Sequence, residues 1–468
     1  MAYIGSLNMA FITVDNILEA TGGELLSENS TTFKGVSIDS RTISEGEVFF
    51  AIRGEKFDGH DFLENALIRG SGAVVDERPG SLPEGKVIVC VNDTLRSLQD
   101  LAHFLRIKRD IPVVAVTGSN GKTTTKEMIY VMLSRKFKAL KNEGNLNNHV
   151  GLPLSIMQLN PDDEVMVLEM GMNAAGEIRR LCEIALPSHG VITNIGSAHV
   201  GKLGSYEAVR KAKLEIMEGL NVAIVNGDDD YLMKGLELIK GFDGQIITFA
   251  IYSDSHVVAR NVGTTETGSE FLLEIRDEGS VSVNLNVYGL FNVYNALAAS
   301  AVGYSLGMNI DEIKIALEAH SAFPMRFEVI KKEGITIIND SYNANPASIK
   351  ESVTELIRLG YKGRVVAILG DMRELGEFSE DEHRDVGRMI AATGVDILIA
   401  VGERMGLAAE ECMKAINVKA GPEVFVFRDV NDAKENITSI LKRGDTVLIK
   451  GSRSMTMERI MEGIDNAL

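Results

Sequence analysis

A short glycine loop is the first stretch of this sequence that points to chemistry. It reads "VVAVTGSNGKTTTKE", from Val113 to Glu127. The general phosphate-binding pattern, G-x-x-x-x-G-K-S/T, needs a glycine where this chain has Val116, so the loop is shorter than the general one. Gly118 and Gly121 still let the backbone approach an anion, and Lys122 supplies a positive charge. The loop predicts a nucleotide-phosphate site, and the alternative is an ordinary strand-to-helix turn that contains glycine.

Two elements must position this loop, a buried strand over 113–117 and a helix over 123–137. The helix start points its N–H groups at an anion, and the Thr123 hydroxyl suits Mg²⁺. Glu169 ends the apolar strand "EVMVLEM", and His199 follows the strand "GVITNI". Because parallel strands bring their carboxyl ends to one edge, Thr123, Glu169 and His199 predict a Mg²⁺ site. For His199 taken alone, a structural role is an equal alternative.

The lysines of "VRKAKLEI" need a different interpretation. Lys211, Lys213 and Glu215 on a helix are typical of a solvated face. The residues alone give no reason to single out one of these lysines. His383, in "SEDEHRDVG", is expected on an exposed helix without a catalytic role.

Composition excludes several classes of protein. The 468 residues include 48 basic and 66 acidic ones, for a net charge of −18, which argues against nucleic-acid binding. We find no apolar run long enough to span a membrane and expect a cytoplasmic chain. Three separated cysteines, Cys90, Cys182 and Cys412, predict inert thiols rather than a metal site. Nothing in the sequence demands more than a monomer.

The order of predicted elements indicates an α/β protein of three domains. Residues 1–108 mix short strands and helices, and from there apolar strands alternate with amphipathic helices, which predicts a parallel sheet covered on both faces. Alternating residues over 245–288 predict a small antiparallel appendage, followed by a long apolar helix over 292–306. A second α/β segment follows. The expected domains are 1–108, 109–322 and 323–468.

At this point the chain resembles a known family, the ATP-dependent Mur ligases of peptidoglycan synthesis. The family's short loop, T-G-x-N/S-G-K-T, matches Thr117–Thr123, and the resemblance covers essentially the whole chain. It implies an N-terminal domain for a UDP-sugar, a central ATPase domain and a C-terminal Rossmann-like domain. It also implies the reaction: the γ-phosphate of ATP moves to a peptide carboxylate, and an amine attacks the acyl phosphate to give an amide, ADP and phosphate.

The resemblance implies roles for individual residues. ATP would be held by Thr117, Gly118, Ser119, Asn120, Gly121, Lys122, Thr123, Asn292, Asn295, Arg326 and Asp340. Two Mg²⁺ ions would be held by Thr123, Glu169, His199 and Lys213, the last corresponding to a lysine that is carbamylated in relatives. The catalytic set would be Lys122, Glu169, His199 and Lys213. For Asn292 and Asn295 the alternative is capping of their own helix.

Three stretches point to a specific acceptor and amine within the family. They are "DSYNANPASIKESV" (340–353), "GDMRELG" (370–376) and "EGNLNNHVGLP" (143–153). Their resemblance implies that D-alanyl-D-alanine is joined to UDP-N-acetylmuramoyl-tripeptide, whose third residue stays open between lysine and diaminopimelate. The substrate-binding residues implied are Asp39, Ser40, Arg41, Asn145, Asn147, Asn148, Asn343, Asn345, Lys450, Ser452 and Arg453.

Other functions remain alternatives. A diamino-acid-adding Mur ligase or a folate polyglutamate ligase would share the ATP chemistry, and an ATP-hydrolysing switch protein would need no acceptor pocket. A Gly–Ser turn before a helix also explains Lys450, Ser452 and Arg453. The base that deprotonates the amine stays open between a carboxylate, the phosphate leaving group and His199.

Overall fold

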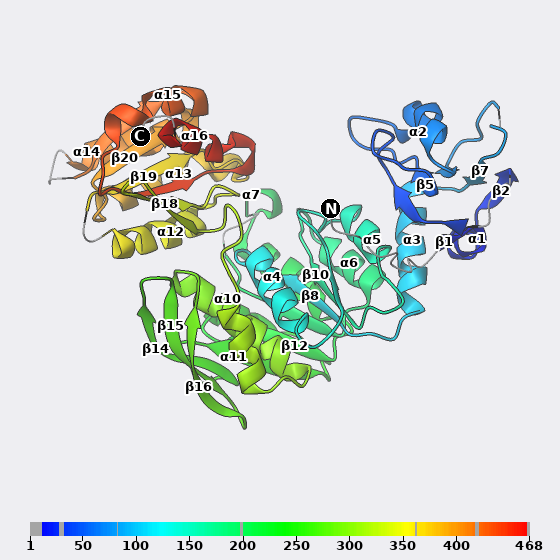
Figure 1. Cartoon of the computed structure of the whole chain (residues 1–468), viewed down its shortest axis with the longest axis horizontal. Helices are drawn as coiled ribbons and strands as arrows, with labels where there is room; N and C mark the ends of the chain where they lie inside the picture. Colours follow the sequence, from blue (N-terminus) through cyan, green and yellow to red (C-terminus); the bar gives the residue numbers. More distant parts are fainter. Residues whose placement is uncertain are drawn as a thin grey trace.

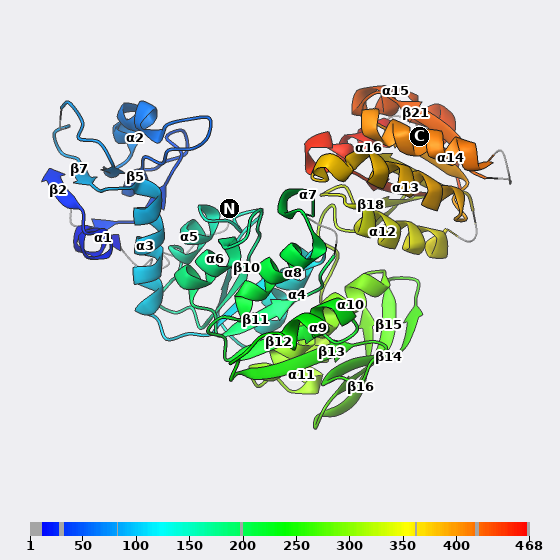
Figure 2. The ribbon, with the colours of Figure 1, turned by 180° about the vertical axis from the view of Figure 1, so that it is seen from behind.

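The computed structural model describes residues 12–27, 32–81, 83–196, 200–360, 363–416 and 421–465. Three large sheets organise the chain, and Figures 1 and 2 show the N-terminal and C-terminal units at opposite ends of the central one. α3 (Thr94–Ile107) leads from the N-terminal unit to the central strand β8 (Val113–Thr117). The three-domain α/β prediction is confirmed, and the joins at 108/109 and 322/323 stay predictions.

The N-terminal unit is built on a five-stranded sheet in the order β2-β7-β6-β5-β4. β4, β5, β6 and β7 are parallel, and β2 is antiparallel to β7. α1 and α3 cover one face and α2 the other. The elements are β1 (Ile12–Thr13), α1 (Val14–Thr21), β2 (Glu24–Ser27), β3 (Thr32–Phe33), β4 (Gly35–Ser37), β5 (Glu47–Phe50), α2 (Leu63–Arg69), β6 (Gly72–Val75) and β7 (Val87–Cys90).

The central unit holds a nine-stranded sheet, β16-β15-β14-β13-β12-β11-β8-β10-β9. Alternate residues of β8 enter different cores: Val114 and Val116 contact the layer of α4, α10 and α11, and Val113 and Ala115 the layer of α5, α6, α8 and α9. The strands are β9 (Ala139–Lys141), β10 (Val165–Glu169), β11 (His189–Ile192), β12 (Val222–Asn226), β13 (Gln245–Ala250), β14 (Val257–Thr264), β15 (Ser269–Ile275) and β16 (Gly279–Leu285). The helices are α4 (Lys122–Leu133), α5 (Gly151–Ile156), α6 (Glu177–Ala185), α7 (Val200–Leu203), α8 (Tyr206–Leu214), α9 (Asp230–Leu236), α10 (Leu290–Ser305) and α11 (Ile310–Glu318).

The predicted antiparallel segment is confirmed for β14, β15 and β16 and wrong for its start. β13 pairs in parallel with β12 and with β14, so the antiparallel part of the sheet begins only where β14 pairs with β15. Polar–apolar alternation reports a half-exposed strand, and it carries no information on strand direction.

The C-terminal unit has a six-stranded sheet, β17-β18-β22-β19-β20-β21, parallel except for β17. α12, α13 and α14 cover one face, and α15 and α16 the other. The elements are β17 (Glu328–Lys332), β18 (Ile335–Asn339), α12 (Pro346–Leu359), β19 (Val365–Gly370), η3 (Gly376–Phe378), α13 (Ser379–Ala391), β20 (Ile397–Val401), α14 (Glu403–Ile416), β21 (Glu423–Phe427), α15 (Val430–Ile440), β22 (Thr446–Lys450) and α16 (Ile460–Asp465).

The position of His383 differs from the prediction. His383 was expected to be exposed, but it is fully buried on α13, where its Nε2 accepts a hydrogen bond from the Met372 amide at 3.0 Å.

The three thiols are free, and burial raises the pKa of Cys182 to about 12 and that of Cys412 to about 11. Among the described residues, no helix is long and apolar enough to cross a membrane.

Candidate functional site

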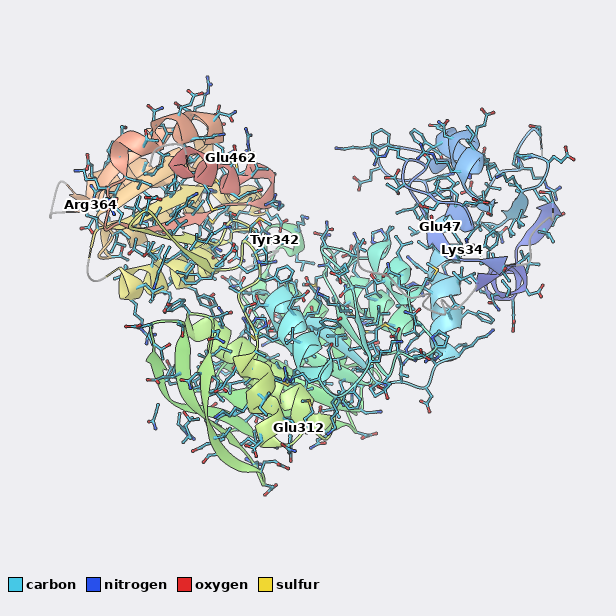
Figure 3. The ribbon with its side chains drawn as sticks, viewed as in Figure 1. Lys34, Glu47, Glu312, Tyr342, Arg364 and Glu462 are labelled. Atoms are coloured by element: carbon cyan, nitrogen blue, oxygen red, sulfur yellow. The ribbon has the colours of Figure 1, made fainter. Side chains whose placement is uncertain are left out.

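A cavity of about 950 Å³ lies where the central and C-terminal sheets meet. Both sheets present the carboxyl ends of their parallel strands to it, the edge where open α/β sheets bind ligands. The central sheet contributes segments after β8, β10, β11 and β12, and the C-terminal sheet contributes segments after β18, β19 and β22. Figure 3 labels Tyr342, one of its lining residues, at the junction of the two units.

The glycine loop after β8 lines this cavity from Ser119 to Thr124. Gly118 and Gly121 have φ values of 150° and 79°. A Cβ on Gly118 would lie 1.9 Å from Thr193 Oγ1, and one on Gly121 would lie 2.5 Å from Asn295 Oδ1. Both glycines are therefore required by conformation and by close approach.

Lys122, the first residue of α4, folds back over the loop. Its Nζ donates to the carbonyls of Gly118 at 2.8 Å and Ser119 at 3.2 Å. Desolvation lowers the pKa of Lys122, while the negative charges of Glu169 and Glu374 oppose that shift. A cation so placed is ready to exchange carbonyl partners for phosphate oxygens.

Further bonds hold the other loop residues in place. Thr117 Oγ1 donates to the Met170 carbonyl at 3.0 Å. Ser119 Oγ accepts from the Gly196 amide at 2.7 Å, and the Asn120 amide donates to Asn194 Oδ1 at 2.9 Å. The loop is thus tied to the ends of two neighbouring strands, which fixes its shape.

Glu169 is a buried carboxylate at the end of β10. Its Oε1 accepts a hydrogen bond from Asn147 Nδ2 at 2.7 Å, whereas Oε2 is buried without a hydrogen-bond partner among the described residues. Asn142 fixes the Glu169 backbone from both sides, accepting from its N–H at 2.8 Å and donating to its C=O at 3.0 Å. A rigidly held carboxylate oxygen of this kind suits a hard cation.

Lys213 is buried, and its interpretation as part of a solvated face is wrong. The side chain is 1% exposed, and Nζ donates to the Gly118 carbonyl at 2.7 Å. Desolvation, with a smaller contribution from the charge of Lys122, lowers the pKa of Lys213 well below its ordinary value. Lys211, two residues earlier, is the solvated lysine and pairs with Glu207 at 2.8 Å.

The predicted metal set is only partly described. His199 lies outside the described residues. Among those that are described, no group of three His, Cys, Asp or Glu side chains forms a metal cluster. Thr123 lines the cavity with Glu169, and its hydroxyl accepts from Arg326 Nη2 at 3.1 Å.

Asn292 and Asn295 lie inside α10 instead of capping it, because the N-cap is Gly289. A chain of hydrogen bonds links α4 to α10: Thr125 Oγ1 donates to Asn295 Oδ1 at 3.1 Å, and Asn295 Nδ2 donates to Asn292 Oδ1 at 3.1 Å. Both asparagines line the cavity and are buried. The capping alternative is therefore excluded for them.

Arg326 joins the two units. Besides contacting Thr123, its guanidinium stacks on the Tyr342 ring at 3.7 Å, and its Nε is buried without a partner among the described residues. Met325 and Phe327, on either side, have φ values of 62° and 52°, which are strained for non-glycine residues. The backbone of residues 325–327, which link the two units, thus directs the Arg326 guanidinium at the phosphate loop.

The remaining C-terminal candidates already have partners within the protein. Lys450 is buried and pairs with Asp340 Oδ2 at 2.5 Å, and Ser352 Oγ donates to the same oxygen at 2.7 Å. Asn345 caps α12 and also donates from Nδ2 to Asn120 Oδ1 at 2.8 Å. Asn343 Oδ1 accepts from the Ala344 amide, Ser452 Oγ accepts from the Arg373 amide, and Arg453 pairs with Glu458.

The asparagine-rich loop and the N-terminal candidates occupy different places. Asn145, Asn147 and Asn148 all line the cavity, although Asn148 Oδ1 also accepts from the Gly151 amide at 2.8 Å. Asp39, Ser40 and Arg41 are not among the lining residues. Arg41 is exposed and pairs with Asp39 at 2.6 Å, and this guanidinium lowers the pKa of Asp39 to about 2.

Several lining residues were not predicted. Tyr342 stacks on Arg326, and Asp228 accepts from the amides of Ile251, Tyr252 and Ser253 and from the Tyr294 hydroxyl. Asp228 follows the strand β12, so the rule that located Glu169 also applies to it. Glu374 lay within a stretch noted above, but its position in the cavity depends on how the two units meet.

Three family models match successive parts of this chain. The Mur ligase catalytic-domain model matches residues 32–108, the middle-domain model 116–303 and the glutamate-ligase-domain model 325–453. The chain belongs to the Mur ligase family. A relative of this family from Bacillus subtilis (strain 168), named UDP-N-acetylmuramoyl-tripeptide–D-alanyl-D-alanine ligase, is 35% identical over 97% of the chain and 98% of its own length. The Escherichia coli (strain K12) protein of that name is 34% identical over 97% and 99%.

Solved Mur ligase structures agree with the fold. A MurF from Acinetobacter baumannii has a TM-score of 0.90 at 31% identity, covering 98% of this chain and 100% of that one. A MurF ligase from Thermotoga maritima, in complex with ADP, has a TM-score of 0.82 at 29% identity, covering 92% and 97%.

Proposed function

We propose that this Mur ligase joins D-alanyl-D-alanine to UDP-N-acetylmuramoyl-tripeptide at the expense of ATP, giving the pentapeptide precursor of peptidoglycan. The full-length similarity to relatives named for this reaction supports the substrates. The observation that carries the chemistry is the cavity itself, where a phosphate loop with its lysine, Lys122, and a buried carboxylate, Glu169, face the edge of a second sheet.

ATP would bind with its phosphates on the loop. The N-terminus of α4, the loop amides and Lys122 would neutralise the phosphates. Arg326 would reach them from the linker, since its Nη2 already touches Thr123. Asn292 and Asn295 would contact the base. Forming an acyl phosphate brings two anions together, so these positive groups lower a barrier that is mainly repulsion.

The residues present fit Mg²⁺. Glu169 Oε2 is a buried oxygen with no hydrogen-bond partner among the described residues, and the Thr123 hydroxyl lines the same cavity. Thr123 and Glu169 would hold one ion, and His199 with a carbamylated Lys213 would hold a second. Bound Mg²⁺ supplies charge neutralisation for the phosphoryl group. The lowered pKa of Lys213 supports carbamylation, because only a neutral amine attacks CO₂.

The UDP-muramoyl peptide and the dipeptide would contact residues from all three units. Asp39, Ser40 and Arg41 are proposed for the uridine nucleotide, with Arg41 able to pair bidentately with phosphate. Asn145, Asn147 and Asn148 would contact the peptide, and Asn343, Asn345, Lys450, Ser452 and Arg453 would position the dipeptide. Arg41 must exchange Asp39 for its ligand, since the two are paired.

A panel of acceptors and amines tests this assignment. The enzyme is incubated with ATP, Mg²⁺ and either UDP-muramoyl tripeptide or UDP-muramoyl dipeptide, and with D-alanyl-D-alanine, lysine, diaminopimelate or glutamate as the amine. Mass spectrometry should find one new product, the pentapeptide. Ligation of a single amino acid to the dipeptide acceptor would instead identify a diamino-acid-adding ligase.

A further inference from the structure

Asn142 is a buried asparagine that follows β9 and lies beside the end of β10. It is 1% exposed, and its amide donates to the Val167 carbonyl at 3.4 Å, which extends the parallel pairing of the two strands by one residue. A continued parallel ladder would take the Glu169 amide to the main-chain carbonyl of Asn142. Instead the Glu169 amide donates to Asn142 Oδ1 at 2.8 Å, so a side chain replaces the main chain at this step.

The side-chain Nδ2 of Asn142 makes two further hydrogen bonds. It donates to the Glu169 carbonyl at 3.0 Å and to the Leu146 carbonyl at 2.9 Å, so both of its N–H groups are used. Leu146 belongs to the asparagine-rich loop, and the next residue, Asn147, donates to Glu169 Oε1 at 2.7 Å. One side chain thus holds both the backbone of Glu169 and the loop that orients its carboxylate.

The main-chain carbonyl of Asn142 is free for a different partner, Lys126. Lys126 lies on α4 and is completely buried, and its Nζ donates to this carbonyl at 2.7 Å and lies 2.9 Å from Glu127 Oε1. Glu127 Oε2 pairs in turn with Lys141, the last residue of β9, at 2.6 Å. Because breaking a buried ion pair leaves an uncompensated charge, this cluster fixes α4 against the end of β9.

These contacts connect two proposed ligands of Mg²⁺. Thr123 and Lys126 lie one turn apart on α4, the helix that begins at the phosphate loop and packs against β10 (Figure 1). Lys126 holds Asn142, and Asn142 holds Glu169. Movement of Glu169 relative to Thr123 therefore requires buried hydrogen bonds to break. Glu169 Oε2, which is buried without a hydrogen-bond partner among the described residues, is the oxygen held in this way.

We propose that Asn142 is a positioning residue, which holds the Glu169 carboxylate where it binds Mg²⁺ together with Thr123. This inference rests on the proposed Mg²⁺-dependent ligation. Removing a group that hydrogen-bonds a metal ligand weakens metal binding by about 10- to 100-fold. Asn142 acts on the backbone of the ligand, so we expect an effect at the lower end of that range. An Asn142 with a purely structural role would affect stability and leave the affinity for the ion unchanged.

The test compares Asn142→Ala with Asn339→Ala. Asn339 ends β18 in the C-terminal sheet, is 2% exposed and bonds to Glu328 and Ser341, and it is not among the described residues that line the cavity. Each protein is mixed with ADP and Mn²⁺, which takes the same oxygen ligands as Mg²⁺. The EPR signal of free Mn²⁺ gives the dissociation constant of the bound ion, and thermal unfolding measures stability.

Asn142→Ala should weaken Mn²⁺ binding about tenfold, and Asn339→Ala should leave it within about twofold of the wild type, although both variants lose stability. In the ligation assay, the KM for Mg²⁺ of Asn142→Ala should rise about tenfold, and saturating Mg²⁺ should restore kcat to within about threefold. A wild-type Mn²⁺ dissociation constant in Asn142→Ala would overturn the positioning role, as would equal weakening in both variants.

Lys126→Met decides the matter if Asn142→Ala does not fold. This variant removes the ammonium that holds the Asn142 carbonyl, so Mn²⁺ binding should weaken about threefold. Lys136→Met is its control and should leave Mn²⁺ binding unchanged, because Lys136 pairs with Glu312 outside the cavity. Unchanged binding in Lys126→Met would overturn the positioning role. Failure of the wild type to form the pentapeptide would instead overturn the proposed function.

Discussion

The two sheet edges that meet at the cavity differ in the partners of their lysines. On the central edge, the hydrogen bonds that Lys122 and Lys213 make to described residues go to backbone carbonyls, and desolvation lowers the pKa of both. On the C-terminal edge, the buried Lys450 pairs with Asp340. Burial disfavours the charged forms of Lys122 and Lys213, whereas Lys450 has a carboxylate partner. Such groups are typical of the place where chemistry occurs, and the C-terminal edge is better suited to positioning.

The largest expected effect follows from removing a cation of the central edge. Lys122→Ala should lower pentapeptide formation by about 1000-fold or more, because the Lys122 ammonium lies over the Gly118 and Ser119 carbonyls, where it would neutralise phosphate. Lys136→Ala is a matched control, since Lys136 pairs with Glu312 outside the cavity. Product mass measures activity and thermal unfolding measures the fold. A Lys122→Ala enzyme with the wild-type rate would refute the loop assignment.

Lys213→Ala should reduce ligation about 100-fold, and short carboxylates such as acetate should partly restore it by replacing a carbamate. The control is Lys211→Ala, two residues away on the same helix but exposed. Initial rates with and without added acetate, in buffer equilibrated with CO₂, measure the effect. Equal rates for the two variants would return Lys213 to a purely structural role.

Arg326→Ala tests the bridge between the edges. The variant loses the contact with Thr123 and the stack on Tyr342, so we expect the KM for ATP to rise about tenfold with a smaller change in kcat. Arg388→Ala, which removes an exposed pair with Asp385 on α13, should leave both constants unchanged. An unchanged KM in Arg326→Ala would mean that Arg326 only joins the units.

The smallest effect is expected on the C-terminal edge. Asn345→Asp keeps the oxygen that caps α12 and loses the N–H₂ group that contacts Asn120. Stability should change by less than about 0.5 kcal/mol, while the KM for ATP rises about threefold through the lost bond and the added negative charge. Asn309→Asp, at the cap of α11, is the matched control. A large loss of stability in Asn345→Asp but not in Asn309→Asp would contradict the view that the C-terminal edge mainly positions ligands.

The sequence predicted the site residues of the central edge better than those of the C-terminal edge. Glycine spacing and strand ends located Lys122 and Glu169, because local backbone geometry fixes where such residues point. The burial of Lys213 and His383 could not be predicted, since charged and imidazole groups on amphipathic helices are normally exposed and only tertiary packing shows otherwise.

Contacts between the units could not be predicted from the sequence either. The bonds of Arg326 to Thr123 and of Asn345 to Asn120 join residues about two hundred positions apart, and no local pattern encodes how two sheets dock. Asn343, Asn345, Lys450 and Asp340 were placed from family resemblance as substrate or nucleotide contacts. In the structure they also satisfy one another and the helix cap, so their ligand roles stay predictions.

Phosphate release tests the central claim most directly, that the two edges together ligate substrates and do not merely hydrolyse ATP. Release from ATP and Mg²⁺ is measured with UDP-N-acetylmuramoyl-tripeptide alone, with D-alanyl-D-alanine alone, and with both. We predict sustained release only with both, one phosphate for each pentapeptide formed. Release that is equally fast without either substrate would contradict the ligase and favour an ATP-driven switch.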